Sequence, residues 1–221
     1  MTKAISTFNP NAAMPAFIPT GDAGAGNKNV TNDDMTVPRM NLLQLISHEL
    51  KKTSPKYIEG AEAGKIVNTL NKEMFDHVHL VNLYYDREFT IFNNNRQFVG
   101  TFNSLNEAQA YLTEHGLKDA DNNIVDTGRH TCMQLAEDGT QLGTVVVLMS
   151  GSKQRVSNEW NTQLAARSKT EPRYASIWRL DPSEEANSRG DTYFNYALSF
   201  AGYVDESTYA DVKAMSDILS S

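Results

Sequence analysis

A locally basic stretch with aromatic neighbours lies between residues 150 and 180 of this 221-residue chain. It holds six basic and two acidic residues, a local charge of +4 in a chain whose net charge is −7. Proteins that bind single-stranded nucleic acids need this combination, because basic side chains follow the phosphates and aromatic rings stack on the bases at about 1–3 kcal/mol each. The predicted contact residues are Lys153, Arg155, Arg167, Lys169, Arg173 and Arg179, with Trp178, Tyr193 and Tyr84 as stacking residues.

The same residues also have a purely structural interpretation. Tryptophan is mostly buried in folded proteins, and charged residues on a helix are usually solvated. Val156, Trp160 and Leu164 recur at helical spacing, which favours the core for Trp160. Strand alternation over residues 192–200 groups Phe200 with other apolar residues as core and leaves Tyr193 on the opposite face, free to meet a ligand.

Two further pairs could do chemistry. His77 and His79 fall on one face of a strand, a spacing that can ligate zinc, but the sequence offers no further ligand to complete the site. His130 and Cys132 share a strand face and could form an activated thiolate, but no third group is visible to orient them. No phosphate-binding glycine motif occurs. We therefore expect no metal, no cofactor and no enzymatic activity.

The elements that must position these residues follow from periodicity and from turn signals. Residues 1–36 lack apolar periodicity and predict a flexible arm, followed by a single domain over residues 37–221. The fold class is α+β, an OB-like antiparallel β-barrel of about seven strands with about three peripheral helices. Residues 40–50 fit either a helix or a strand. The expected strands are 65–70, two within 77–92 that divide near Asp86, 130–135, 141–149, 174–180 and 192–200, and the expected helices are 104–115, 150–167 and 206–219.

Composition limits the protein's surroundings and partners. The sequence has no apolar run of the length that a membrane span needs and no export signal at its start, so we expect no membrane contact. A single cysteine, Cys132, agrees with a reducing cytoplasm. The net charge of −7 argues against coating of duplex DNA through bulk positive charge, but it leaves room for a single basic groove.

Four segments carry a resemblance to a known family. The sequence resembles tailed-bacteriophage single-stranded DNA-binding proteins, which are similar in role to the helix-destabilising protein of T7-type phages, over residues 37–44, 57–69, 98–100 and 150–161. The resemblance implies an OB-fold, a place in phage DNA replication or recombination, and the host cytoplasm as location. T7-type proteins end in an acidic tail with a terminal aromatic residue, whereas this chain ends in Leu219-Ser220-Ser221, so recruitment of partners through such a tail is not expected.

Two functions from different classes remain open. The first is sequence-independent binding of single-stranded DNA, with phage replication proteins and a second copy of the chain as further partners. The alternative is a phage structural or host-interaction protein that acts through protein–protein contacts. Burial of Trp178 and Tyr193, with the basic residues scattered over opposite faces, would weaken the first.

Overall fold

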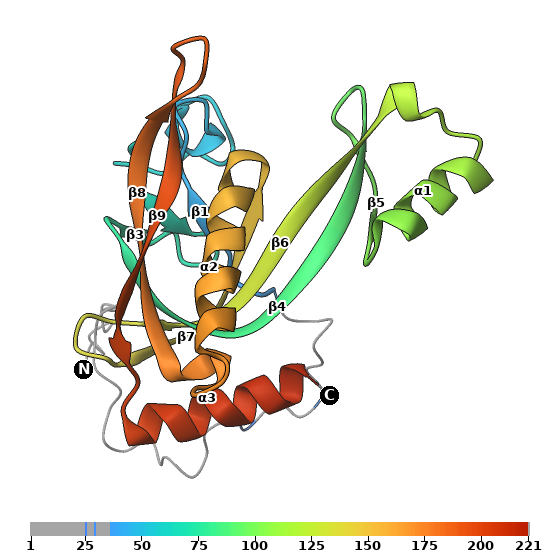
Figure 1. Cartoon of the computed structure of the whole chain (residues 1–221). Helices are drawn as coiled ribbons and strands as arrows, with labels where there is room; N and C mark the ends of the chain where they lie inside the picture. The colour runs from blue at the N-terminus through green and yellow to red at the C-terminus, as the bar shows by residue number, and fades with distance from the viewer. Residues whose placement is uncertain (1–24, 26–28, 30–35, 221) are drawn as a thin grey trace, which may run out of the picture. The chain divides into compact units, whose positions relative to one another are not determined.

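The computed structural model of the chain describes residues 36–220, together with Ala25 and Asn29. Apart from Ala25, Asn29 and Thr36, the arm predicted over residues 1–36 therefore lies outside the described residues. The strands are β1 (Met40–Leu42), β2 (Ile66–Asn68), β3 (Met74–Phe75), β4 (Val78–Asn93), β5 (Phe98–Phe102), β6 (Asn122–Leu135), β7 (Gln141–Ser150), β8 (Ser176–Ala186) and β9 (Thr192–Tyr203), and the α-helices are α1 (Leu105–Glu114), α2 (Gln154–Arg167) and α3 (Glu206–Leu219) (Figure 1).

The strands form two antiparallel sheets. Strands β1, β2 and β3 make a small sheet, and the larger sheet has the order β7-β6-β4-β8-β9, with β5 paired to β4. The α+β class is confirmed, but the OB-like barrel is wrong, because the edge strands β7 and β9 do not pair with each other. The free edge of β7 is partly occupied: Val146 N donates to Pro38 O at 2.8 Å, so the chain that leads into β1 takes the place a closing strand would need.

Strand β4 organises the larger sheet. The predicted division near Asp86 is wrong, since β4 runs unbroken for 16 residues and pairs with β6 along its length. Cross-strand ion pairs, Arg87 with Asp126 and Arg129 with Asp86, hold the middle of this ribbon together, as opposite charges on facing strands do. The irregularity in the strand is a register shift between Asn82 and Tyr84, not a turn.

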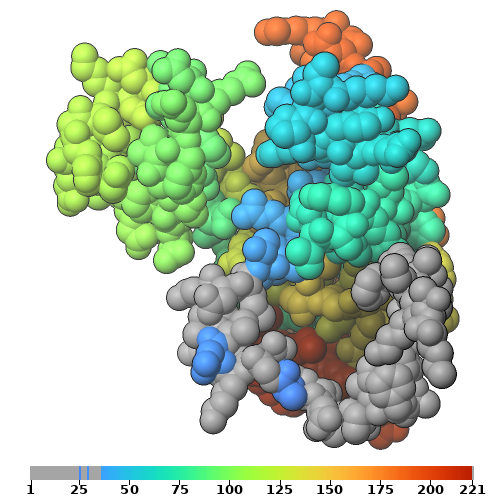
Figure 2. Space-filling view, turned by 180° about the vertical axis from the view of Figure 1, so that it is seen from behind, coloured from blue at the N-terminus to red at the C-terminus, as the bar shows by residue number. Residues whose placement is uncertain are grey.

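The far halves of β4 and β6 carry a separate lobe made with β5 and α1. Its core contains Phe89, Ile91, Ala108 and Leu112. Helix α1 begins and ends close to where the sequence predicts, and Ser104 caps its start by accepting a hydrogen bond from the Glu107 backbone N–H. Figure 2 shows this green lobe standing apart from the cyan residues that precede β4.

The main core lies under α2. Val156, Trp160 and Leu164 are buried as a stripe, as predicted, and pack with Trp178 from β8. The apolar run at 145–149 belongs to β7, which lies at an edge of the larger sheet and is covered by the segment before β1.

The C-terminal helix α3 covers the other side of β4. Val212 packs against Val81 and Leu83, and Ser216 Oγ donates to Leu83 O at 2.9 Å at the register shift of β4. Its bounds match the predicted helix over residues 206–219. Within the described residues, no helix has the length and apolar character required to cross a membrane.

Candidate nucleic-acid interface

An exposed aromatic pair lies at the end of β9, beside the end of α2. Phe200 is 39% exposed and Tyr203 59% exposed, and their rings meet edge to face with centroids 5.2 Å apart. The guanidinium of Arg167 lies over the Phe200 ring, 4.1 Å from its centroid, and donates to Tyr203 Oη at 3.3 Å. We call Phe200, Tyr203 and Arg167 the aromatic platform. It places two ring surfaces beside a guanidinium that also pairs with Glu171 at 3.4 Å.

A β-bulge aligns the two rings of the platform. Ile177 pairs with Gly202 and Trp178 with Phe200, so Ala201 is an extra residue in β9. One extra residue shifts the alternation of a strand, which lets Phe200 and Tyr203 share a face although they lie three positions apart. Phe200 does lie on the same face as the core, as its spacing predicts. It is exposed because α2, which covers that face, ends at Arg167.

Trp178 does not serve as a stacking surface, and this prediction is corrected. Its side chain is 0% exposed, and its Nε1–H donates to Ser176 Oγ at 3.0 Å. The face of β8 that carries Trp178 turns into the main core, where the apolar ring is most stable. Trp178 instead lies under the platform, with its centroid 5.8 Å from that of Phe200.

The predicted basic residues divide into neutralised and available groups. Arg155 pairs with Glu185 at 2.6 Å, Arg179 with Asp181 at 2.7 Å and Arg167 with Glu171 at 3.4 Å, so the charges of these three arginines are offset by carboxylates. Lys169 is exposed two residues beyond Arg167 in the chain. The continuous basic edge that the sequence predicts is thus reduced to the neighbourhood of the platform.

The other two predicted stacking residues, Tyr193 and Tyr84, are partly exposed, and each interacts with a carboxylate. Tyr193 Oη donates to Glu185 Oε2 at 2.8 Å, and this hydrogen bond raises the pKa of the tyrosine. The pKa of Tyr84 is raised by the negative charge of Asp86. Lys153 lines a pocket of about 190 Å³ with Tyr196, and burial lowers the pKa of the lysine. These residues do not join the platform.

Arg173 begins a buried chain of hydrogen bonds. It donates to Asn82 Oδ1 at 3.1 Å and to Asn161 Oδ1 at 3.0 Å. Asn82 Nδ2 lies 2.9 Å from His130 Nδ1, and His130 Nε2 lies 2.8 Å from Ser157 Oγ. Asn82, His130 and Ser157 are all 0% exposed.

The serine, histidine and asparagine are arranged in the order of a catalytic triad, but the hydrogen bonds between them run in the opposite direction. Arginine can only donate, so Asn82 must turn its oxygen to Arg173 and its amide N–H to His130 Nδ1. His130 then carries its proton on Nε2 and donates to Ser157, whereas a triad histidine needs a free Nε2 to accept the serine proton. Burial lowers the pKa of His130 to about 3, which keeps the ring neutral.

Cys132 lies in the same core, and burial raises the pKa of its thiol. The predicted pairing with His130 therefore supplies no thiolate, because a charged sulfur is disfavoured where water is excluded. The Asn82–His130–Ser157 chain satisfies polar groups beneath α2 and fixes the helix to β4 and β6.

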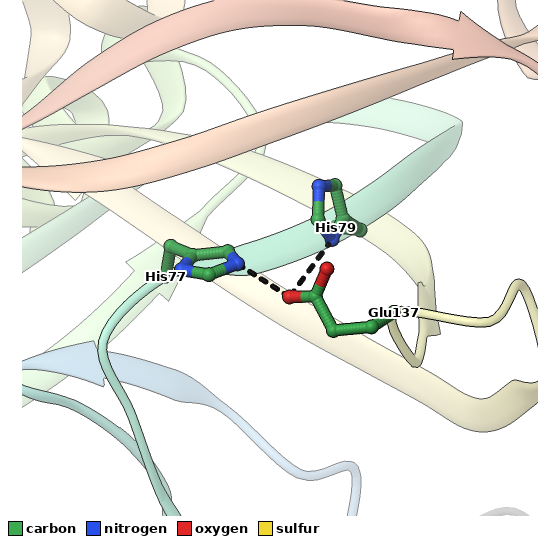
Figure 3. A group of neighbouring side chains, drawn as sticks. All are labelled: His77, His79 and Glu137. Atoms are coloured by element: carbon green, nitrogen blue, oxygen red, sulfur yellow. Dashed lines mark hydrogen bonds and ion pairs between the residues drawn. The ribbon is translucent and has the colours of Figure 1, made fainter.

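The pair His77 and His79, at the start of β4, gains a third potential ligand from the fold. His77 Nε2 lies 2.5 Å from Glu137 Oε1, and His79 Nδ1 lies 3.7 Å from the same oxygen (Figure 3). The sequence did not reveal Glu137, which follows β6 and lies 60 positions from His77. Within the part of the chain that the structure describes, His77, His79 and Glu137 are the one group of three or more histidine, cysteine, aspartate or glutamate side chains close enough to share a metal ion.

Comparison with known proteins places the chain in a family. No curated protein and no solved structure matches it. The model of the Pam3 phage gp34-like protein family matches residues 8–221, nearly the whole chain. The chain therefore belongs to the Pam3 phage gp34-like protein family.

Proposed function

We propose that this phage protein binds single-stranded DNA without sequence preference, in support of phage DNA replication or recombination, and that it acts as a binding protein rather than an enzyme. The observation that carries the proposal is the aromatic platform. Stacking needs exposed ring faces beside positive charge: Phe200 and Tyr203 provide the rings, and Arg167, which shares its charge with Glu171, and the exposed Lys169 provide the cations. Every base has a flat π-face, so such a platform tolerates any sequence.

One further basic residue is suited to a phosphate contact. Lys169 is exposed in the chain just after Arg167, whereas both terminal nitrogens of Arg173 donate to the side chains of Asn82 and Asn161. A phosphate oxygen can therefore approach Lys169 without first displacing a carboxylate. Local charge of this kind accounts for binding by a chain whose net charge is −7.

The platform is tested by replacing Phe200 with alanine. Loss of one stacked base is worth about 1–3 kcal/mol, so the Phe200→Ala variant is expected to bind fluorescein-labelled oligo-dT roughly tenfold more weakly, measured by fluorescence anisotropy at low salt. Phe98→Ala is the matched control, because Phe98 is 65% exposed on the lobe of β5 and α1, away from the platform. Its affinity should equal that of the wild type.

Salt dependence gives a second, independent readout. Removing one phosphate contact should make the slope of log K against log salt shallower by about 0.7, the value for single strands. We expect this change for Lys169→Ala and not for Lys118→Ala, a lysine at the end of the lobe. Absence of oligo-dT binding by the wild type at low salt would overturn the proposal and favour a structural or host-interaction role through protein contacts.

A further inference from the structure

Three side chains from two neighbouring segments converge at the start of β4. His77 lies just before the strand and His79 within it, and Glu137 lies in the turn between β6 and β7. Figure 3 shows both imidazole rings turned toward one carboxylate. We call His77, His79 and Glu137 the His-Glu cluster. Their potential ligand atoms all lie within 4.8 Å of one another.

Backbone pairing holds the cluster in place. His79 pairs with Leu135 across β4 and β6, which sets Glu137 two residues beyond the paired position. The turn that carries Glu137 is closed by a hydrogen bond from Ala136 N to Thr140 O at 2.8 Å. His79 on a paired strand and Glu137 in a short turn keep the separation of their backbones, and His77 follows from its place two residues before His79.

The donor set matches a borderline divalent transition metal ion. Two imidazole nitrogens and one carboxylate oxygen are ligands of zinc sites that keep an open position, whereas magnesium and calcium prefer oxygen alone. Zinc–ligand bonds of about 2.0–2.2 Å place tetrahedral ligand atoms roughly 3.3 Å apart. The 3.7 Å between His79 Nδ1 and Glu137 Oε1 is close to this value.

For a metal ion to bind, one contact of the cluster must lengthen, and it involves Glu137, the most exposed of the three side chains. His77 Nε2 and Glu137 Oε1 are 2.5 Å apart, too close for an ion to bridge without movement. The Glu137 side chain is 74% exposed, while those of His77 and His79 are 23% and 17% exposed. The carboxylate can therefore withdraw by less than an ångström at little cost while both rings stay fixed.

The surrounding charge does not oppose a cation. Arg179 faces His79 on the neighbouring strand β8, but it pairs with Asp181 through several short hydrogen bonds. Its positive charge is thus offset within the pair. Cys132, the one cysteine of the sequence, is buried and cannot compete for an ion from solvent.

We propose that His77, His79 and Glu137 bind one divalent transition metal ion, with Zn²⁺ as the best match, and that solvent completes its coordination. The ion links the β6–β7 turn to the start of β4. Because it binds only the folded arrangement, it stabilises the protein by RT ln(1 + [Zn²⁺]/Kd). The proposal is independent of DNA binding, since the cluster contains no residue of the aromatic platform.

The test uses the untagged full chain, stripped with a chelator and titrated with ZnCl₂ by calorimetry. The wild type is expected to bind one Zn²⁺ per chain, and Glu137→Gln, which keeps the shape but removes the charge, to bind at least tenfold more weakly. Melting temperature should rise with Zn²⁺ for the wild type, rise much less for Glu137→Gln, and stay constant with MgCl₂. His115→Gln is the control and should behave as the wild type.

A second variant guards against loss of the fold. His79→Gln should also lose Zn²⁺ binding, and circular dichroism should show wild-type secondary structure for Glu137→Gln, whose side chain lies at the surface. The proposal is overturned if the wild type binds no Zn²⁺, or if Glu137→Gln and His79→Gln bind it as tightly as the wild type. Unchanged oligo-dT affinity of Glu137→Gln would separate this site from the proposed function.

Discussion

Acidification from pH 7 to pH 4 is expected to lower the free energy of unfolding by about 3 kcal/mol through His130 alone. Burial lowers the pKa of this ring to about 3 in the folded protein, and the positive charge of Arg173 contributes in the same direction. The unfolded chain titrates near 6.5, so below that pH it binds a proton that the folded protein does not. This stability is present above about pH 6.5 and is lost progressively as the pH falls toward 3.

The measurement is urea unfolding from pH 7 to pH 4 on the wild type and on His130→Gln. Carboxylates with lowered pKa values also lose stability in acid, but they are common to both proteins and cancel in the difference. His130→Gln should be less stable at pH 7 and show a shallower decline with acid. His115→Gln, an exposed histidine of the lobe, should follow the wild-type curve. Parallel curves for wild type and His130→Gln would contradict a neutral buried ring.

Replacing Gly128 with alanine is expected to destabilise the protein by about 2 kcal/mol, because extra volume in a packed interior forces its surroundings apart. A Cβ atom at this position would lie 2.4 Å from Ser157 Oγ and 3.3 Å from both Ser157 Cβ and a ring carbon of Tyr85. Gly128 thus allows α2 to approach β6 closely enough for Ser157 to reach His130. Thermal or urea unfolding measures the loss.

A double-mutant cycle identifies the cause. Ser157→Ala alone should cost about 1–3 kcal/mol, because His130 then keeps a buried donor without an acceptor. In Gly128→Ala/Ser157→Ala the closest clash is absent, so the two losses should sum to more than the loss of the double variant. If the two losses of stability simply add, the loss in Gly128→Ala does not come from a clash with Ser157.

Local patterns allowed much of the helical structure to be predicted. Helix α1 has a serine cap at its start, and α3 extends over the predicted residues 206–219. The stripe of Val156, Trp160 and Leu164 identified the buried face of α2. These features show themselves in residues a few positions apart, so local sequence patterns were enough to predict them.

Strand alternation predicted which residues share a face of the sheet, but not which other elements cover that face. Alternation placed Phe200 on the core side of β9 correctly, yet its exposure depends on where α2 ends and on the bulge at Ala201. Alternation also left Trp178 open to a binding role, and only the packing of α2 over β8 shows it buried. The same limit applies to the barrel, because closure depends on which strand edges remain free.

By itself the sequence determined the α+β class, the three helices, the basic stretch and the unusual pair His77 and His79. Only the tertiary structure decided the order of the strands, the partners of the basic residues and the sites. Arg167 meets Phe200 across 33 positions, and His77 meets Glu137 across 60. Contacts of this range follow from strand register and helix packing, which many different sequence patterns can satisfy, so periodicity cannot specify them.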